Sequence, residues 1–204
     1  MTTHPDIVLF DLGNVLVDWN PRHLYGKVFA GRPAEMEHFL THVCNQAWNE
    51  RHDAGKPFQE NVAELSALHP WYAAEIGAYW TRWQETMKGE IPGTVDLLKR
   101  LKANGVAVHA LTNWSAETFP FAEAAFDWLD LFGQVVVSGR IGMKKPEARI
   151  FEHAAAQCPL TPARTLFVDD GERNTRAASA LGYHVHLFRE PAGLETCLKD
   201  HGLL

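Results

Sequence analysis

The sequence predicts an α/β fold, in which a doubly wound parallel sheet carries a small helical lobe inserted near its start. Short apolar or β-branched runs recur along the chain, and their length suits strands. They lie at Ile7–Phe10, Val106–Leu111, Gln134–Val137, Thr165–Val168 and His184–Phe188. Helical patterns fill the gaps from the second run onward, which is the alternation expected of a parallel sheet covered by helices on both faces. The first gap differs, because about ninety residues separate Phe10 from Val106, too many for one crossover.

The same sequence pattern predicts the helices that cover this sheet. They are expected at Thr94–Asn104, Ser115–Phe126, Glu147–Gln157 and Gly171–Leu181, with a weaker pattern near the C-terminus. Asn104-Gly105 and Leu181-Gly182 put Asn or Gly where a helix should stop before the next strand.

The long first gap predicts an inserted helical lobe. From about Trp19 to Lys88 the sequence is helix-like, and Gly89–Gly93 is expected to be the linker that leads out of it. We therefore expect residues 1–17 and 90–204 to form the α/β core domain and residues 18–89 to form a helical domain. Five of the seven tryptophans lie in this lobe, where aromatic side chains at such spacings are more often core than ligand-binding.

Composition excludes several classes of protein. The formal net charge is −6 over 204 residues and no Lys/Arg-rich run occurs, which argues against a nucleic-acid binder. The N-terminus lacks the pattern of a secretory leader, and no run of eighteen apolar residues occurs, so no membrane association is expected. Three cysteines without close spacing suggest reduced thiols. We expect a cytoplasmic protein.

Polar residues follow several of the predicted strands. Asp11 comes directly after the first, Thr112-Asn113 after the second, and Asp169-Asp170 after the fourth, while Lys145 lies between the third strand and the next helix. Ligands of open parallel sheets bind beyond the carboxyl ends of the strands. We therefore expect these residues to share one site.

The chemistry of these residues is complementary. Asp11 and Asp170, with Asp169 as a further candidate ligand, would repel one another unless a hard divalent cation such as Mg²⁺ lay between them. The Thr112 hydroxyl, the Asn113 amide groups and the Lys145 ammonium are donors suited to phosphate oxygens. Together they predict a site that binds a phosphoryl group and leaves one carboxylate free as a nucleophile.

Four segments of the chain resemble, in order, the four motifs of the haloacid dehalogenase-like hydrolases. They are Phe10–Val17, Leu111–Asn113, Lys145-Pro146 and Asp169–Asn174. Within the family the sequence most resembles bacterial phosphatases of small sugar phosphates, which carry a helical cap after the first strand. The resemblance implies a hydrolase with a Rossmann-like core.

The resemblance also implies a role for each motif residue. Asp11 would attack phosphorus and form an aspartyl-phosphate that water then hydrolyses. Thr112 and Lys145 would bind the phosphoryl oxygens, and the family's lysine directly precedes a proline, which favours Lys145 over Lys144. Mg²⁺ would be held by Asp11, Asp170 and the backbone carbonyl of Gly13, while Asp169 and Asn174 would orient the metal shell or the nucleophile.

One position departs from the family. Most of its phosphatases carry an aspartate two residues after the nucleophile as general acid and base, and here that residue is Gly13. A proton shuttle contributes about 10²–10⁴-fold to the rate. The substrate could have a good leaving group, or the proton could come from water or from a histidine of the lobe, His23 or His52.

Two other functions would also explain Gly13. A 2-haloacid dehalogenase would use Asp11 without metal, and a catalytically weak protein would only bind a phosphorylated ligand as a regulator. The paired Asp169-Asp170 disfavours the dehalogenase, because that group usually has neutral residues there, and the retained motifs disfavour the regulator.

Two further residues are candidates for substrate binding. Arg22 lies where the chain enters the lobe, with a surface salt bridge as an equally good interpretation, and Trp114 could stack on a sugar or pack in the core. The sequence thus predicts a Mg²⁺-dependent phosphatase of a small phosphorylated metabolite, acting as a monomer or a small homo-oligomer.

Overall fold

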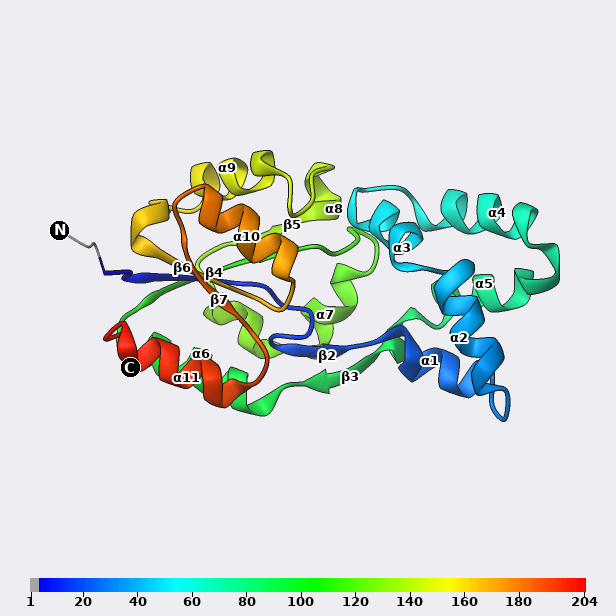
Figure 1. The fold of residues 1–204 in the computed structure, drawn as a ribbon, viewed down its shortest axis with the longest axis horizontal. Helices are drawn as coiled ribbons and strands as arrows, with labels where there is room; N and C mark the ends of the chain where they lie inside the picture. The colour runs from blue at the N-terminus through cyan, green and yellow to red at the C-terminus, as the bar shows by residue number, and fades with distance from the viewer. Residues whose placement is uncertain (1–3) are drawn as a thin grey trace.

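The computed structural model describes residues 4–204 and is built on a five-stranded parallel sheet (Figure 1). Its strands are β1 (Ile7–Phe10), β4 (Ala107–Thr112), β5 (Val135–Val137), β6 (Thr165–Asp169) and β7 (His184–Leu187). They lie in the order β5-β4-β1-β6-β7, and each neighbouring pair is parallel. The chain fills one side of β1 before it crosses to the other, which confirms the predicted doubly wound sheet. Residues 1–3, the start of the predicted core domain, lie outside the described residues.

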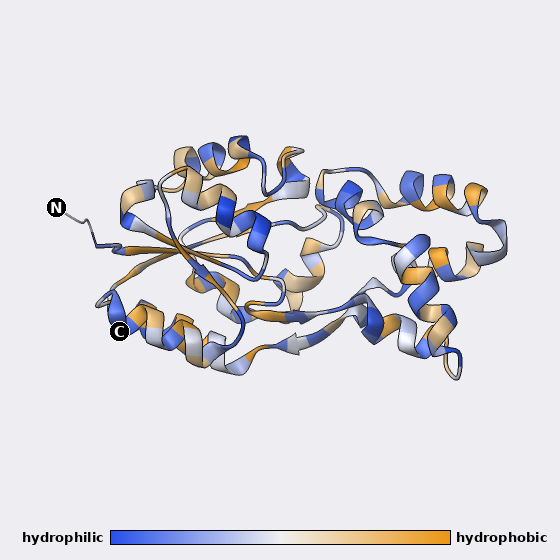
Figure 2. Cartoon of the chain, viewed as in Figure 1, coloured by the Kyte–Doolittle hydropathy of each residue, from blue (hydrophilic) through white to orange (hydrophobic). Residues whose placement is uncertain are grey.

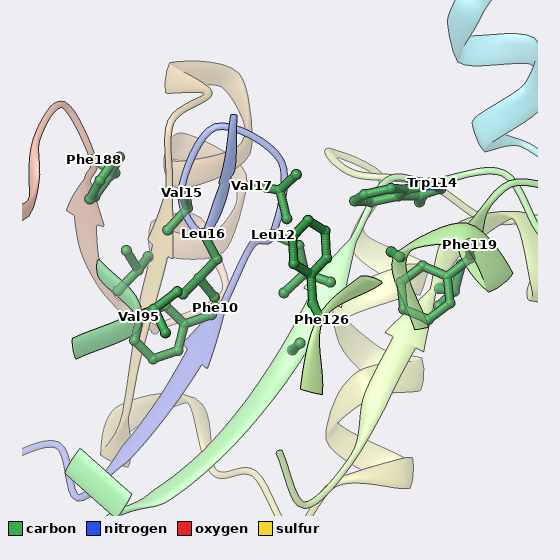
Figure 3. Close-up of a cluster of buried hydrophobic side chains, with 14 of the residues drawn as sticks. Phe10, Leu12, Val15, Leu16, Val17, Val95, Trp114, Phe119, Phe126 and Phe188 are labelled. Carbon is green, nitrogen blue, oxygen red and sulfur yellow. The ribbon is translucent and has the colours of Figure 1, made fainter. Parts of the chain in front are cut away.

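Helices cover both faces of this sheet (Figure 1). On one face lie α6 (Pro92–Ala103) and α11 (Pro191–Asp200), and on the other lie α9 (Ala148–Gln157) and α10 (Glu172–Ala180). Because successive strand side chains point to opposite faces, β1 contributes to two cores. Val8 and Phe10 belong to the larger one, and Ile7 and Leu9 to the smaller. The strands are accordingly among the most hydrophobic segments, and Phe10 packs near Val95 of α6 (Figures 2 and 3).

The remaining core elements are short. They are α7 (Phe119–Ala125), α8 (Ser138–Ile141) and the 3₁₀ turns η3 (Asp127–Leu131) and η4 (Pro162–Arg164). The predicted helix over Ser115–Phe126 is thus shorter than expected, because its first residues form the loop after β4. Within residues 4–204, no helix has both the length and the apolar character needed to cross a bilayer.

A helical segment is inserted between β2 (Val17–Trp19) and β3 (Met87–Glu90) and lies beyond the carboxyl ends of the central strands (Figure 1). We call it the inserted helical segment. It contains α1 (Pro21–Val28), α2 (Pro33–His42), α3 (Gln46–Asp53), α4 (Phe58–Leu68), η1 (Pro70–Tyr72), α5 (Ala73–Thr81) and η2 (Trp83–Thr86). Its core is aromatic, as predicted, and the buried ring of Tyr25 contacts the buried rings of Phe39 and Tyr79.

The connection predicted as a linker over Gly89–Gly93 is different in the structure. β2 and β3 pair antiparallel, with Val17 opposite Glu90 and Asp18 opposite Gly89, and α6 already begins at Pro92. Gly and Pro favoured a linker, but the backbone here satisfies its hydrogen bonds by strand pairing. The two connections to the inserted helical segment are therefore joined to each other.

Candidate active site

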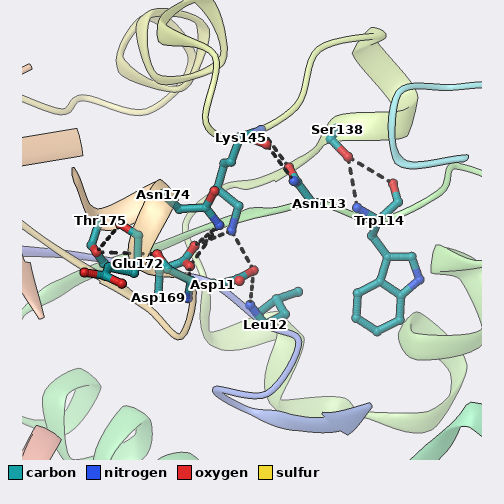
Figure 4. A network of polar contacts seen from close by, with 11 residues as sticks. Asp11, Leu12, Asn113, Trp114, Ser138, Lys145, Asp169, Glu172, Asn174 and Thr175 are labelled. Carbon is teal, nitrogen blue, oxygen red and sulfur yellow. Dashed lines mark hydrogen bonds and ion pairs between the residues drawn. The ribbon is translucent and has the colours of Figure 1, made fainter. Parts of the chain in front are cut away.

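Most of the residues predicted to share a site come together at the carboxyl edge of the sheet, and Figure 4 shows Asp11, Asn113, Lys145 and Asp169 there. Asp11 directly follows β1, Thr112 is the last residue of β4, and Asp169 is the last residue of β6. Parallel strands bring such positions to one edge, so the strand order alone makes them neighbours.

Lys145 lies at the centre of this group and is completely buried. Its Nζ is 2.8 Å from Asp11 Oδ1 and 2.7 Å from Asp169 Oδ2. Burial lowers the pKa of the Lys145 ammonium, but the charges of Asp11 and Asp169 outweigh burial and hold the pKa above its ordinary value. Lys145 therefore stays positively charged between two carboxylates, whereas Lys144 points elsewhere and pairs with Glu50.

Asp11 presents two different oxygens. Oδ1 accepts from the backbone N–H of Leu12 at 2.8 Å and faces Lys145, whereas within residues 4–204 no donor bonds to Oδ2. Burial raises the pKa of Asp11 to about 8, Lys145 opposes this, and the charges of Asp169 and Asp170 add to it. Asp11 is thus held through Oδ1, and a cation at this site would favour the ionised form that can react through Oδ2.

The two acids after β6 have different environments. Asp169 is fully buried and accepts from Lys145, from the Gly171 N–H at 2.7 Å and from Asn174 Nδ2 at 2.9 and 3.2 Å. Asp170 lines a cavity, and its pKa is raised by burial and by Asp169, against Lys145 and a hydrogen bond from Asn14. A Cβ at Gly171 would come within 2.9 Å of Asp169 Oδ1, so only glycine fits between Asp170 and α10.

These acids fit a divalent cation. One oxygen from each of Asp11, Asp169 and Asp170 lies within 4.8 Å of the others. Three carboxylates against the single Lys145 leave an excess of two negative charges, which one such ion would neutralise. Carboxylate oxygens are the hard ligands that Mg²⁺ takes, so the chain is equipped for Mg²⁺. Asp11 and Asp170 face the cavity, whereas both oxygens of Asp169 are already engaged and make it a positioning group.

The phosphate donors predicted on β4 are placed differently from one another. The Asn113 side chain donates to the Lys145 carbonyl at 3.0 Å and accepts the Lys145 N–H at 2.8 Å, so it fixes the lysine loop instead of facing a ligand. The Thr112 hydroxyl is buried and lacks a partner among the described residues. Asn113 lines the cavity over the site, whereas Thr112 does not, so the unpartnered Thr112 hydroxyl is buried away from the cavity surface.

A cavity of about 360 Å³ opens over this edge, within the usual size of small-molecule sites. Asp11, Gly13 and Asp170 line one side of it. Aromatic rings from the inserted helical segment and the core line other parts, namely Trp19, Phe58, Trp83 and Trp114. Trp114 is 5% exposed, donates through Nε1 to Thr118 and packs on Trp83, so it is both packed and cavity-lining.

Arg22 lies outside this cavity. Its guanidinium pairs with Glu37 of α2 at 2.6 Å, and both side chains are about half exposed. The structure therefore shows the surface salt bridge that the sequence left open. The histidine candidate His23 also lies outside and pairs with Asp18 at 2.9 Å.

Sequence reasoning missed several residues of the site, among them Asn14, Glu50 and Asp53. Asn14 lines the cavity with a φ of 56°, a left-handed conformation that asparagine tolerates well. On α3, Asp53 lines the cavity, and Glu50 forms ion pairs with Lys144 and Arg173 of the core. The spacing of Glu50 and Asp53 puts both on one face of a helix, which was the available signal.

A family model for haloacid dehalogenase-like hydrolases matches residues 5–182. The chain belongs to the haloacid dehalogenase-like hydrolases. Sesquiterpene phosphatase astK of Aspergillus oryzae is 30% identical over 202 residues, which are 98% of this chain and 96% of that protein. Drimenol cyclase drtB of Aspergillus calidoustus is 22% identical over 90% of this chain but only 34% of its own length.

Solved structures share the fold of this chain. The crystal structure of the HAD family enzyme BT-2542 from Bacteroides thetaiotaomicron has a TM-score of 0.70 at 23% identity, covering 92% of this chain and 95% of that one. The family match confirms the predicted hydrolase. With the acidic pair and Lys145 at the sheet edge, the chain is a phosphatase of the haloacid dehalogenase-like hydrolases.

Proposed function

We propose that this phosphatase is a Mg²⁺-dependent phosphomonoester hydrolase that forms an aspartyl-phosphate on Asp11. The observation that carries the proposal is the asymmetry of the Asp11 carboxylate. Lys145 and the Leu12 N–H hold Oδ1, whereas Oδ2 accepts no hydrogen bond from the part of the chain that the structure describes. A nucleophile needs such a fixed, partly free carboxylate.

In the first step Asp11 Oδ2 attacks phosphorus and the substrate oxygen leaves. Lys145 offsets the charge on Asp11 and the phosphoryl group, and the Thr112 hydroxyl and the Asn113 backbone N–H donate to phosphoryl oxygens. Water then attacks phosphorus and releases phosphate, restoring Asp11. Asp11, Asp170 and the Gly13 carbonyl would hold Mg²⁺, which supplies electrostatic stabilisation of the transferring group. Asp169 and Asn174 keep Lys145 and Asp11 in place.

We propose that the substrate is a small phosphate monoester whose organic part has an apolar face. The aromatic lining of the cavity supports this, because such rings pack on apolar surfaces. The description covers the sugar phosphates expected from the sequence, and also suits the similarity to a sesquiterpene phosphatase. The inserted helical segment, predicted as residues 18–89, would act as a cap that covers this substrate.

The BT-2542 enzyme has been crystallised with magnesium and inorganic phosphate, which is consistent with this proposal. The cytoplasmic location and the monomeric or small homo-oligomeric state stay predictions.

The decisive experiment is phosphate release from sugar, isoprenoid, nucleoside and acyl phosphates, with Mg²⁺ and with EDTA. We expect release with Mg²⁺ and its loss in EDTA. Chloride release from 2-chloropropionate that persists in EDTA would instead establish the dehalogenase. Binding of phosphate esters without any turnover would establish the regulator.

A further inference from the structure

The proposed reaction needs a proton for the leaving oxygen, and the usual donor is absent. Gly13 occupies the position of the acid and lines the cavity, and no heavy atom of the described residues lies within 4 Å of a Cβ built on it. A general acid must be within reach of the leaving group, so its replacement has to line the same cavity.

Among residues 4–204, five titratable residues line the cavity: Asp11, His52, Asp53, Asp170 and Arg173. Asp11 is the nucleophile and Asp170 belongs to the cation site. Arg173 pairs with Glu50, and a guanidinium does not give up its proton in a protein. His52 and Asp53 are left.

His52 is excluded by its hydrogen bonds. Its Nδ1 faces the Lys56 carbonyl at 3.3 Å, and therefore carries the proton, while Nε2 accepts from Asn61 Nδ2 at 3.0 Å. The ring is 1% exposed and stacks on Phe58, and burial lowers the pKa of His52 to about 4. Both nitrogens are engaged in structural bonds, so the predicted histidine donors are not the acid.

Asp53 is the last residue of α3 and is 8% exposed. Asn49 Nδ2 donates to its Oδ2 at 3.4 Å, and the Tyr79 hydroxyl donates to Asn49 Oδ1, which fixes that amide. Within residues 4–204 no other hydrogen bond reaches the carboxyl, although the residue lines the cavity. One oxygen is therefore oriented by Asn49, and the other is available to a substrate.

We propose that Asp53 is the general acid and base of this phosphatase, supplied by the inserted helical segment in place of the residue at Gly13. The inference rests on the proposed function. As Asp11 Oδ2 bonds to phosphorus and the ester P–O bond breaks, Asp53 gives its proton to the leaving oxygen. As water then bonds to phosphorus and the bond from Asp11 breaks, the Asp53 carboxylate takes the water's proton and returns to its starting form.

The surroundings of Asp53 suit both steps. Burial raises its pKa to about 7, Glu50 adds to this, and Lys144, Lys145 and Arg173 oppose it. The other titratable groups near it are the neutral His52 and the Tyr79 hydroxyl, whose pKa Asp53 helps to raise. Asp53 also lies at the C-terminus of α3, where the partial negative charge of the helix end disfavours the ionised form of its carboxyl group. An acid that titrates near neutral pH can both donate and accept.

The test compares two aryl esters, phenyl phosphate and 4-nitrophenyl phosphate. Asp53→Asn should lower kcat/KM by about 10²–10⁴-fold for phenyl phosphate, whose leaving oxygen is the stronger base, and by less than about tenfold for 4-nitrophenyl phosphate.

The pH profile gives a second readout. Wild-type kcat/KM for phenyl phosphate should fall above about pH 7, and the variant should lack this alkaline limb of the profile. With 4-nitrophenyl phosphate the variant should show a burst of one nitrophenol per site, because hydrolysis of the aspartyl-phosphate has lost its base. Glu60→Gln, an exposed carboxyl change on α4, is the matched control and should behave as wild type.

Rescue provides the second measurement. The open space at Gly13 admits a side chain, so Gly13→Asp in the Asp53→Asn background should recover at least tenfold in kcat/KM for phenyl phosphate, whereas Gly13→Asn should not. An equal loss of kcat/KM on both esters, without a burst or rescue, would overturn the role of Asp53 and leave the proposed function intact. A wild-type protein that releases phosphate from no ester overturns both.

Discussion

The two sides of the cavity are held in different ways. The floor, which consists of Asp11, Lys145, Asp169 and Asn174, is a buried network with bonds of 2.7 to 3.2 Å. The wall, which consists of Asn49, Asp53, Phe58 and Trp83, belongs to the inserted helical segment. It meets the core through the ion pairs of Glu50 with Lys144 and Arg173 and through a bond from the Phe58 N–H to Glu117 at 2.7 Å.

This difference predicts how the floor and the wall respond to substitution. Asp11, Lys145 and Asp169 are each bonded to two or more groups, so removing Lys145 leaves buried carboxylates without compensation. The ion pairs of the wall lie partly in water, where such pairs contribute little. We expect changes in the floor to be severe and changes in the wall to be graded.

The largest effect is expected at the nucleophile. Asp11→Asn should reduce phosphate release to background, because an amide oxygen cannot form the aspartyl-phosphate. The measurement is phosphate release with Mg²⁺, with circular dichroism to show that the fold is retained. Asp96→Asn, on the exposed side of α6, is the control. Undiminished turnover by Asp11→Asn would refute the proposed mechanism.

The next effect is on stability, at Lys145. Lys145→Met leaves Asp11 and Asp169 buried without their cation and should cost about 3–5 kcal/mol of unfolding free energy. Urea denaturation without added Mg²⁺ measures this. Lys144→Met, which removes a partly exposed partner of Glu50, should cost about 1 kcal/mol or less. Equal losses for the two variants would mean that the floor is no more tightly coupled than the wall.

The raised pKa of Asp53 predicts how the unfolding free energy changes with pH. Its pKa is about 7 in the folded chain against 3.8 ordinarily, so the folded state holds the proton more tightly than the unfolded state does. The stability it contributes is present below about pH 4 and is lost as pH rises towards 7. Asp53→Asn should therefore become more stable than wild type over this range, by up to about 4 kcal/mol. Urea denaturation at pH 4.5 and pH 8 measures the difference in unfolding free energy between Asp53→Asn and wild type. A difference that does not grow with pH contradicts the prediction.

The smallest effect is expected at Glu50. Burial raises its pKa, but hydrogen bonds from Lys144 and Arg173 outweigh burial and hold the pKa below its ordinary value. Its contribution is thus present above pH 4.5 and is lost on acidification through the folded pKa. Glu50→Gln should cost about 1 kcal/mol near neutral pH. Because the charge of Glu50 raises the pKa of Asp53, Glu50→Gln should also move the fall in kcat/KM at alkaline pH to a lower pH.

Glu64→Gln is the control for Glu50. Glu64 also bridges two cations, Arg51 and Lys56, but all three lie within the inserted helical segment. Its replacement should leave the alkaline limb in place. A shift as large as that of Glu50→Gln would show that the limb does not report the charge next to Asp53.

The floor could be predicted from the sequence because each of its acids is tied to a strand end. Asp11 and Asp169 close short apolar runs, and the sheet order then brings the two together. Lys145 was found by its place before Pro146, and its burial between the two acids follows from the same edge.

The wall could not be predicted in the same way. Whether Glu50 or Asp53 faces the core depends on how α3 docks, and spacing along one helix fixes only which residues share a face. The short strands β2 and β3 carry too little periodic pattern to separate them from linkers. The sequence therefore points to a good leaving group, to water or to a histidine of the lobe, because the burial that raises the pKa of an aspartate is not visible in a sequence.

The pairing of β2 with β3 has a mechanical consequence. Because Val17 and Asp18 pair with Glu90 and Gly89, the two crossings form a single ribbon and cannot slide or separate independently. Trp19 ends β2 and also lines the cavity, so the pairing that fixes these two strands also positions one aromatic ring of the cavity lining.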